Sequence, residues 1–112
     1  MIRVYVEYFH NTLTKMVIKG HGGLEKGNDI YCAGVSSCLI GALNALENAE
    51  HYSIKIESGY CEVVTINPST EHDKIVLETL IVQLKTIADN YPQRVQTIIS
   101  KKEGKKWNWI YH

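Results

Sequence analysis

A histidine and a cysteine eleven residues apart, His21 and Cys32, are the side chains of this sequence best suited to nucleophilic chemistry. Cys32 follows Asp29 at the point where a helical pattern of apolar residues begins. If Asp29 is the N-cap of that helix, its carboxylate can accept a hydrogen bond from the backbone N–H of Tyr31 or of Cys32. Cys32 then lies in the first helical turn, where the positive end of the helix dipole favours the thiolate, the reactive form of cysteine.

A thiolate nucleophile also needs a base, and His21 is the candidate. Glycines surround this histidine, so the segment can fold back and bring the imidazole within hydrogen-bond distance of the sulfur. These glycines are Gly20, Gly22 and Gly23. Backbone N–H groups at the start of the helix can hold the oxyanion that forms when a thiolate attacks a peptide carbonyl. Ser36 lies one turn after Cys32 and can donate to the sulfur, to a substrate carbonyl or to the backbone carbonyl of Cys32.

Spacing alone favours a purely structural role for the same residues. Cys32 is in register with Val35 and Leu39 of an apolar helical stripe, which is typical of the first residue of a buried face. A histidine in a glycine loop is more often solvated than catalytic, and an aspartate before a helix is usually only a cap. Cys38 and Cys61 are expected to be inert thiols of the core. An odd number of cysteines without CxxC spacing argues against a disulfide scaffold and a cysteine-rich zinc site.

Periodicity predicts the elements that must position these residues. Alternating apolar residues favour strands, and apolar residues at helical spacing favour two helices, the second beginning at the N-cap Thr70. The expected strands are 2–9, 13–19, 52–58, 60–66 and 95–100, and the expected helices are 30–49 and 71–91. The order strand, strand, helix, strand, strand, helix predicts an α+β protein with two helices packed on a mainly antiparallel sheet. A second face of the first helix, with Gly34 and Gly41, is small enough for close contact with the other helix or with a second subunit.

Length and composition favour one small domain. The 112 residues are 45% hydrophobic and 21% charged, and twelve basic residues balance twelve acidic ones. This composition disfavours disorder and nucleic-acid binding by bulk electrostatics. We expect a domain over residues 1–100 and a basic, aromatic tail over residues 101–112. The strand-like start, the absence of a long apolar run and the cysteine usage predict a cytoplasmic protein without a membrane segment.

The stretch from residue 20 to residue 36, GHGGLEKGNDIYCAGVS, resembles the ribosomal-processing cysteine protease (Prp) family. That family combines a GH pair, a glycine-containing loop and the motif DIxCAxxS at a helix start. The resemblance covers the chain to about residue 100. It implies that His21 and Cys32 are the catalytic pair and that Asp29 and Ser36 have supporting roles.

The resemblance also implies a substrate and an assembly state. It implies a cytoplasmic, homodimeric endopeptidase that needs no cofactor or metal. Its expected substrate is the precursor of large-subunit ribosomal protein twenty-seven, from which it removes a short N-terminal extension that ends in apolar residues. Gly22 replaces the usual alanine of the motif, and Tyr31 replaces a smaller aliphatic residue. Tyr31 and the three loop glycines are therefore candidates for contact with the substrate, as are Glu25 and Lys26.

A competing hypothesis is a noncatalytic module that binds the ribosome or RNA through the tail. Lysines precede two tryptophans there, and basic residues beside aromatic ones can pair with phosphates and stack on bases. The residues concerned are Lys101, Lys102, Lys105, Lys106, Trp107 and Trp109. A structural tail packed on the core or on a second subunit is the favoured alternative.

Overall fold

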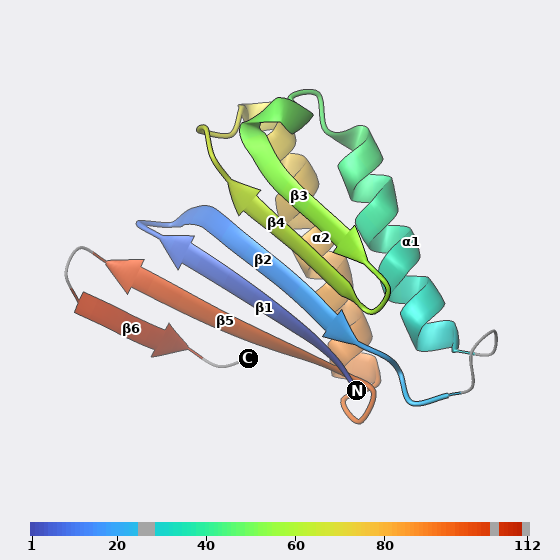
Figure 1. Ribbon diagram of the computed structural model, residues 1–112. Coiled ribbons are helices and arrows are strands. Elements are labelled where there is room, and N and C mark those ends of the chain that lie inside the picture. Colours follow the sequence, from blue (N-terminus) through green and yellow to red (C-terminus); the bar gives the residue numbers. More distant parts are fainter. Residues whose placement is uncertain (25–28, 104–105, 111–112) are drawn as a thin grey trace.

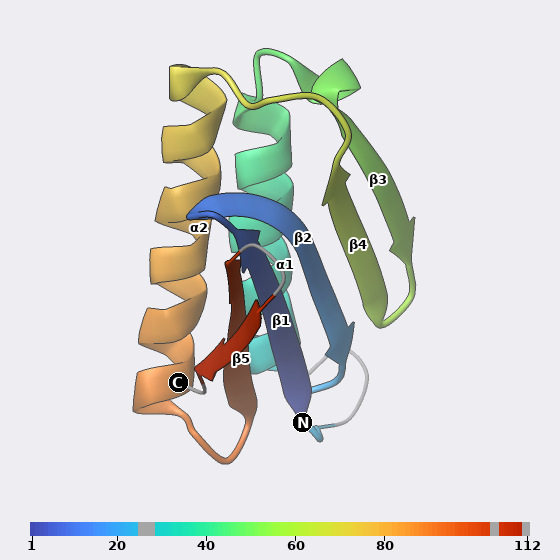
Figure 2. The ribbon, with the colours of Figure 1, turned by 90° about the vertical axis from the view of Figure 1, so that its left-hand side faces the viewer.

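The chain folds into one six-stranded sheet with two helices on one of its faces (Figures 1 and 2). The computed structural model describes residues 1–24, 29–103 and 106–110, with side chains up to residue 102. The elements in chain order are β1 (Ile2–Phe9), β2 (Thr12–Gly20), α1 (Ile30–Ala45), the 3-10 turn Ala49–His51, β3 (Tyr52–Glu57), β4 (Tyr60–Thr65), α2 (Glu71–Asn90), β5 (Val95–Glu103) and β6 (Lys106–Ile110). None of the described helices is long and apolar enough to cross a membrane.

The predicted α+β class and mainly antiparallel sheet are confirmed. The strand order is β3-β4-β2-β1-β5-β6, and β1 with β5 is its one parallel pair over the described strands. The sheet brings together segments far apart in sequence, because β5 returns after α2 to lie beside β1. As a result the end of β2, the start of α1 and the end of α2 all lie at the same end of the molecule (Figure 1).

Strand β5 is longer than the expected strand 95–100. It runs to Glu103 because its backbone continues to pair with β1, where Lys101 lies opposite Tyr8 and Lys102 opposite Phe9. The backbone then turns back as β6 and pairs with β5 in antiparallel register. The first residues of the predicted tail therefore belong to the sheet. Lysines here are compatible with a strand close to the edge, where charged side chains are common.

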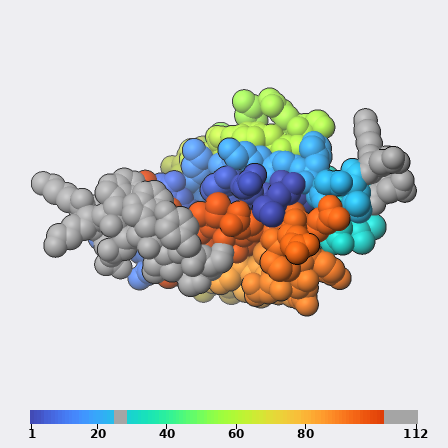
Figure 3. Space-filling model, turned by 90° about the horizontal axis from the view of Figure 1, so that it is seen from below, coloured from blue at the N-terminus to red at the C-terminus, as the bar shows by residue number. Residues whose placement is uncertain are grey.

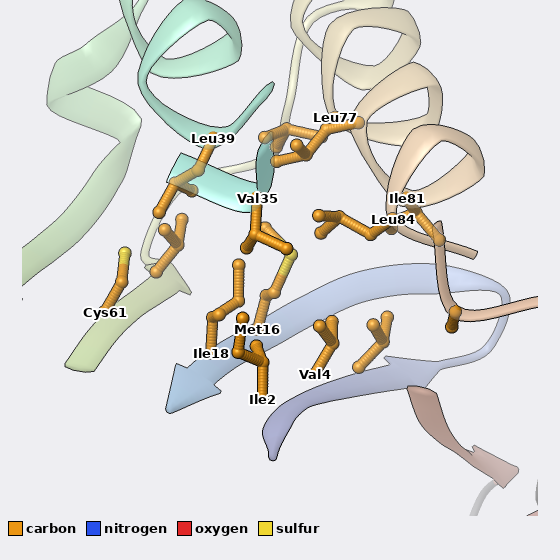
Figure 4. Packing of buried hydrophobic residues seen from close by; sticks show 14 of the residues in the cluster. Ile2, Val4, Met16, Ile18, Val35, Leu39, Cys61, Leu77, Ile81 and Leu84 are labelled. Atoms are coloured by element: carbon orange, nitrogen blue, oxygen red, sulfur yellow. The ribbon is translucent and has the colours of Figure 1, made fainter. Parts of the chain in front are cut away.

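The core lies between the sheet and the two helices (Figure 4). Alternate residues of β1 point into it, and Ile2, Val4 and Val6 are each at most 2% exposed, as the alternating pattern predicts. Helix α2 contributes Leu77, Leu80 and Leu84, all at most 1% exposed. Burial of each such aliphatic side chain stabilises the fold by about 1.5–3 kcal/mol.

Helix α1 ends earlier than the sequence suggested. It stops at Ala45 rather than near residue 49, and Leu46 is already extended. The reason is a tertiary contact: the backbone N–H groups of Glu47 and Asn48 donate to the carboxylate of Asp73 in α2, at 2.8 and 2.9 Å. The backbone N–H groups of Glu47 and Asn48 therefore bind a side chain of α2, and helix α1 does not continue for another turn.

The two glycines of the small face of α1 leave open space around them. A Cβ added to Gly34 or Gly41 would meet no atom of the described structure within 4 Å. Ser37, Gly41 and Ala45 of this face line a groove whose other wall is α2, and contact of the face with a second subunit stays a prediction. The apolar stripe is confirmed: Val35 and Leu39 are buried, and Leu43 and Leu46 pack partly against the core.

Candidate active site

A cleft of about 650 Å³ opens where three separate segments meet. The segments are the connection from β2 to α1, the first two turns of α1 and the turn between β3 and β4, which lies beside α1 (Figure 1). The cleft contains the four residues that the sequence singled out as catalytic or supporting: His21, Asp29, Cys32 and Ser36. Its remaining lining residues are Leu24, Ala33, Ser58 and Gly59.

Asp29 joins the loop of His21 to the start of α1. It is the N-cap of the helix, and its Oδ1 accepts a hydrogen bond of 2.9 Å from the backbone N–H of Cys32, which confirms the predicted cap. Its Oδ2 accepts a second hydrogen bond, of 2.7 Å, from the backbone N–H of Gly22. The N–H of Cys32 and then that of Gly22 stabilise the charged carboxylate and lower the pKa of Asp29, and nearby His21 contributes in the same direction.

Cys32 differs from the other two cysteines in its surroundings. It is half-buried and borders the cleft, whereas Cys61 lies in the core, where burial, followed by the charge of Glu62, raises the pKa of its thiol. Cys38 is also half-buried, but it lines a groove between the two helices. The sealed position expected for a purely structural Cys32 is therefore absent, and this thiol is open to the cleft.

His21 is an exposed side chain that lies on the turn between β3 and β4. A Cβ added to Gly59 would lie 2.7 Å from Nε2 of His21, and Gly59 has a φ of +69°, so this position suits only glycine. The backbone fixes the same junction, because the N–H of Gly20 donates to the carbonyl of Gly59 at 2.9 Å. The sequence identified Gly59 only as a turn residue, since nothing local links it to His21.

A smaller apolar pocket of about 90 Å³ continues from the cleft toward the core. It shares Cys32, Ser36 and Gly59 with the cleft. Aliphatic side chains from four elements form much of its wall, namely Ile2, Ile18, Val35, Leu39, Ile40 and Ile56. The half-buried thiol thus lies between the open cleft and an apolar recess.

The family comparison agrees with this geometry. The model of the cysteine protease Prp family matches residues 1–96. The chain belongs to this family. It is 28% identical over 89 residues to the ribosomal processing cysteine protease Prp of Staphylococcus aureus, a match that covers 75% of this chain and 84% of that protein. The assignment selects the peptidase hypothesis over the noncatalytic RNA-binding one.

Solved structures show the same fold. The crystal structure of Prp from S. aureus in complex with a covalently linked product peptide has a TM-score of 0.78 and 24% identity, and the match covers 93% of this chain and 100% of that one. The protein SMU.848 from Streptococcus mutans has a TM-score of 0.72 and 24% identity, with 91% and 96% of the two chains covered.

In this member of the Prp family, Tyr31 points away from the cleft. Its ring makes an edge contact with Tyr91 at a centroid distance of 5.2 Å, and the guanidinium of Arg94 lies 5.6 Å from its ring centroid. Tyr31 does not line the cleft and instead packs the start of α1 against the end of α2. Gly22, beside Tyr31, is buried. A Cβ added to it would lie 2.3 Å from Oδ1 of Asp29, so this position has no room for a larger side chain.

Other predicted positions contribute in different ways. Gly20 and Gly23 have φ values of +103° and +88°, so both glycines allow backbone conformations that other residues rarely adopt. Glu25 and Lys26 lie outside the described residues, as do the side chains of the two tryptophans and of Lys105 and Lys106. Across the described residues, no three histidine, cysteine or acidic side chains converge to bind a metal ion.

Proposed function

We propose that this chain is an endopeptidase that removes the N-terminal extension of the precursor of large-subunit ribosomal protein twenty-seven. Cys32 is the nucleophile and His21 is the general base and acid in this proposal. The observation that supports it is the shared cleft, whose lining includes both the half-buried thiol of Cys32 and the imidazole of His21.

The reaction proceeds through a thioester. His21 accepts the thiol proton, and the sulfur of Cys32 attacks the scissile carbonyl to give a tetrahedral intermediate. Collapse of this intermediate breaks the C–N bond, and His21 donates the proton to the leaving amine. A water molecule, deprotonated by His21, then attacks the thioester and releases the acid product with the free thiol. Asp29 and Ser36 support these steps from the same cleft, Asp29 through the backbone and Ser36 through its hydroxyl.

The apolar pocket supports a substrate with bulky apolar residues beside the scissile bond. It adjoins Cys32, so a side chain held there lies next to the carbonyl under attack. The relative from S. aureus is named a ribosomal processing protease, and its crystal structure contains a covalently linked product peptide. The proposed extension ends in apolar residues and fits a recess lined mainly by aliphatic side chains.

The test is cleavage of a peptide that spans the extension and the first mature residues, followed by mass spectrometry. We expect Cys32→Ala and His21→Ala to lose cleavage at the junction while their circular dichroism spectra stay unchanged. Cys38→Ala is the matched control, because Cys38 is also half-buried and lies on the same helix but outside the cleft. Cleavage by Cys32→Ala at the rate of the unchanged protein would overturn the assignment of the nucleophile.

A second test separates the substrate from the chemistry. A peptide with the apolar residues of the extension replaced by serine should be cleaved poorly, because it cannot fill the recess. Equal cleavage of both peptides would contradict the proposed substrate and leave the thiol mechanism intact. We also propose that the enzyme is a homodimer that acts in the cytoplasm, where ribosomal precursors are made, and sedimentation equilibrium measures the assembly state.

A further inference from the structure

Arg94 connects strand β1 of the sheet to the loop that carries His21. It belongs to the short connection between α2 and β5, which lies at the same end of the molecule as the end of β2 and the start of α1 (Figure 3). Its own backbone is fixed on both sides. The N–H of Arg94 donates to the carbonyl of Tyr91 at 2.9 Å, and its carbonyl accepts from the N–H of Ile2 at 2.8 Å.

The side chain of Arg94 reaches across to the loop. Its Nη1 donates a hydrogen bond of 2.9 Å to the carbonyl of Gly22, a residue 72 positions earlier in the chain. The guanidinium also lies over the ring of Tyr31, in the first turn of α1. A Cβ added to Gly23 would lie 2.9 Å from the same Nη1, so the loop backbone approaches the guanidinium closely. One planar group therefore contacts both the loop and the helix that bears Cys32.

Both backbone polar groups of Gly22 are held by charged side chains. The N–H donates to Asp29 and the carbonyl accepts from Arg94. Gly22 directly follows His21, and the N–H of Gly22 belongs to the peptide unit that includes the His21 carbonyl. A glycine-rich segment has the greatest backbone freedom of any sequence, so its conformation depends on such external contacts. Charge-assisted hydrogen bonds are stronger than neutral ones and are suited to this role.

We propose that Arg94 is a positioning residue for the proposed catalytic pair, and that its guanidinium holds the loop of His21 in place against the first turn of α1. This inference rests on the proposed function of His21 and Cys32. Asp29 alone fixes one side of Gly22, and Arg94 fixes the other. Without Arg94, the peptide unit after Gly22 is free to rotate, and the imidazole samples positions away from the thiol. Arg94 touches neither reacting atom, so its effect is on geometry.

The experiment compares Arg94→Ala with Arg94→Lys and with Arg3→Ala. Arg3 is the matched control, because it is the only other arginine and is exposed on the neighbouring strand β1. We expect Arg94→Ala to lower kcat on the extension peptide by about 10- to 100-fold, the size of effect that a small misplacement of a catalytic group produces, with KM changed less than about threefold. Arg94→Lys should recover part of kcat, because lysine keeps a charged donor but not the planar group over Tyr31.

Two readouts that need no substrate complete the design. Hydrogen–deuterium exchange should increase at residues 20–24 in Arg94→Ala and stay unchanged in the strands, and Arg3→Ala should show neither change. The rate of alkylation of Cys32 by iodoacetamide, followed by peptide mapping, should fall with kcat. A normal kcat in Arg94→Ala, or an equal loss in Arg3→Ala, would overturn the inference.

The outcomes also separate this inference from the proposed function. If Cys32→Ala and His21→Ala are inactive while Arg94→Ala is fully active, only the role of Arg94 fails. If Cys32→Ala retains cleavage, the proposed function fails first. Uniformly faster exchange across the whole sheet of Arg94→Ala would assign Arg94 to global stability and contradict a role in positioning the loop.

Discussion

Two aspartates at opposite ends of helix α1 make the same kind of contact for different purposes. Asp29 precedes the helix and accepts backbone N–H groups from Cys32 and Gly22. Asp73, in the first turn of α2, accepts backbone N–H groups from Glu47 and Asn48, just after α1 ends. Each carboxylate therefore ties a stretch of irregular backbone to the start of a helix.

The difference lies in burial and in the neighbours. Asp73 is 0% exposed and also contacts the ring nitrogen Nδ1 of His72 at 2.9 Å. Asp29 is only half-buried, and it borders the cleft with His21 and Cys32. A carboxylate bridge in the interior holds helices together, whereas the same bridge at the edge of a cleft leaves its neighbours open to a substrate. Loss of the first should affect stability, and loss of the second should affect chemistry.

The largest effect is expected from Asp73→Ala. This change removes the carboxylate that accepts from the amides of Glu47 and Asn48, and a hydrogen bond to a charged group contributes about 1.5–3 kcal/mol. We expect the free energy of unfolding, measured by urea denaturation, to fall by roughly 2–5 kcal/mol. Asp89→Ala is the control, since Asp89 is exposed near the other end of α2. Equal stability of the two variants would show that the buried bridge contributes nothing.

A smaller change in stability but a clear loss of activity is expected from Asp29→Asn. Asparagine is an equally good N-cap, but the N–H groups of Gly22 and Cys32 bind separate oxygens of Asp29, and in asparagine one of these becomes an NH2 group that cannot accept. We expect kcat on the extension peptide to fall about tenfold with the midpoint of thermal unfolding nearly unchanged. A variant that loses stability in proportion to activity would make the two aspartates equivalent and contradict the distinction.

The smallest effect concerns pH and His72. The hydrogen bond to Asp73, with Glu47 3.6 Å away, raises the pKa of His72 above its ordinary 6.5. The contribution of protonated His72 to folding stability is therefore complete below about pH 6.5. It is lost as pH rises through the pKa of His72 in the folded state. Burial acts to raise the pKa of Asp73, but the hydrogen bonds from His72 and from the two amides outweigh it and lower this pKa below 3.8.

The stabilisation by Asp73 is accordingly complete above about pH 3.8 and is lost as pH falls through its folded-state pKa. Urea midpoints measured across pH should be highest between these two limits. In His72→Gln, the urea midpoint should fall less steeply above pH 6.5. Its decrease at acidic pH should remain mostly unchanged. A decline that persists unchanged in His72→Gln would assign the effect to another group.

Sequence patterns predicted the elements and the local parts of the site. The N-caps Asp29 and Thr70 and the buried face of β1 depend on residues within a few positions of one another, and the structure has all of them. The motif around His21 and Cys32 named two residues that the structure places in one cleft.

Other features could not be predicted, because their partners are distant in the chain. The end of α1 depends on Asp73, 26 residues after Glu47, and the loop of His21 depends on Arg94, 72 residues after Gly22. The length of β5 depends on continued pairing with β1, since lysines alone favour no strand.

The amino-acid order determined which residues can react and which segments become helix or strand, because caps, turns and periodicity act over one or two turns of backbone. Only the tertiary structure decided that the turn at Gly59 lies under His21 and that Arg94 reaches the loop. These contacts follow from the strand order β3-β4-β2-β1-β5, which sets hairpin, loop and helix end side by side. That order is chosen by burial of a common core, a property of the whole chain and of no single segment.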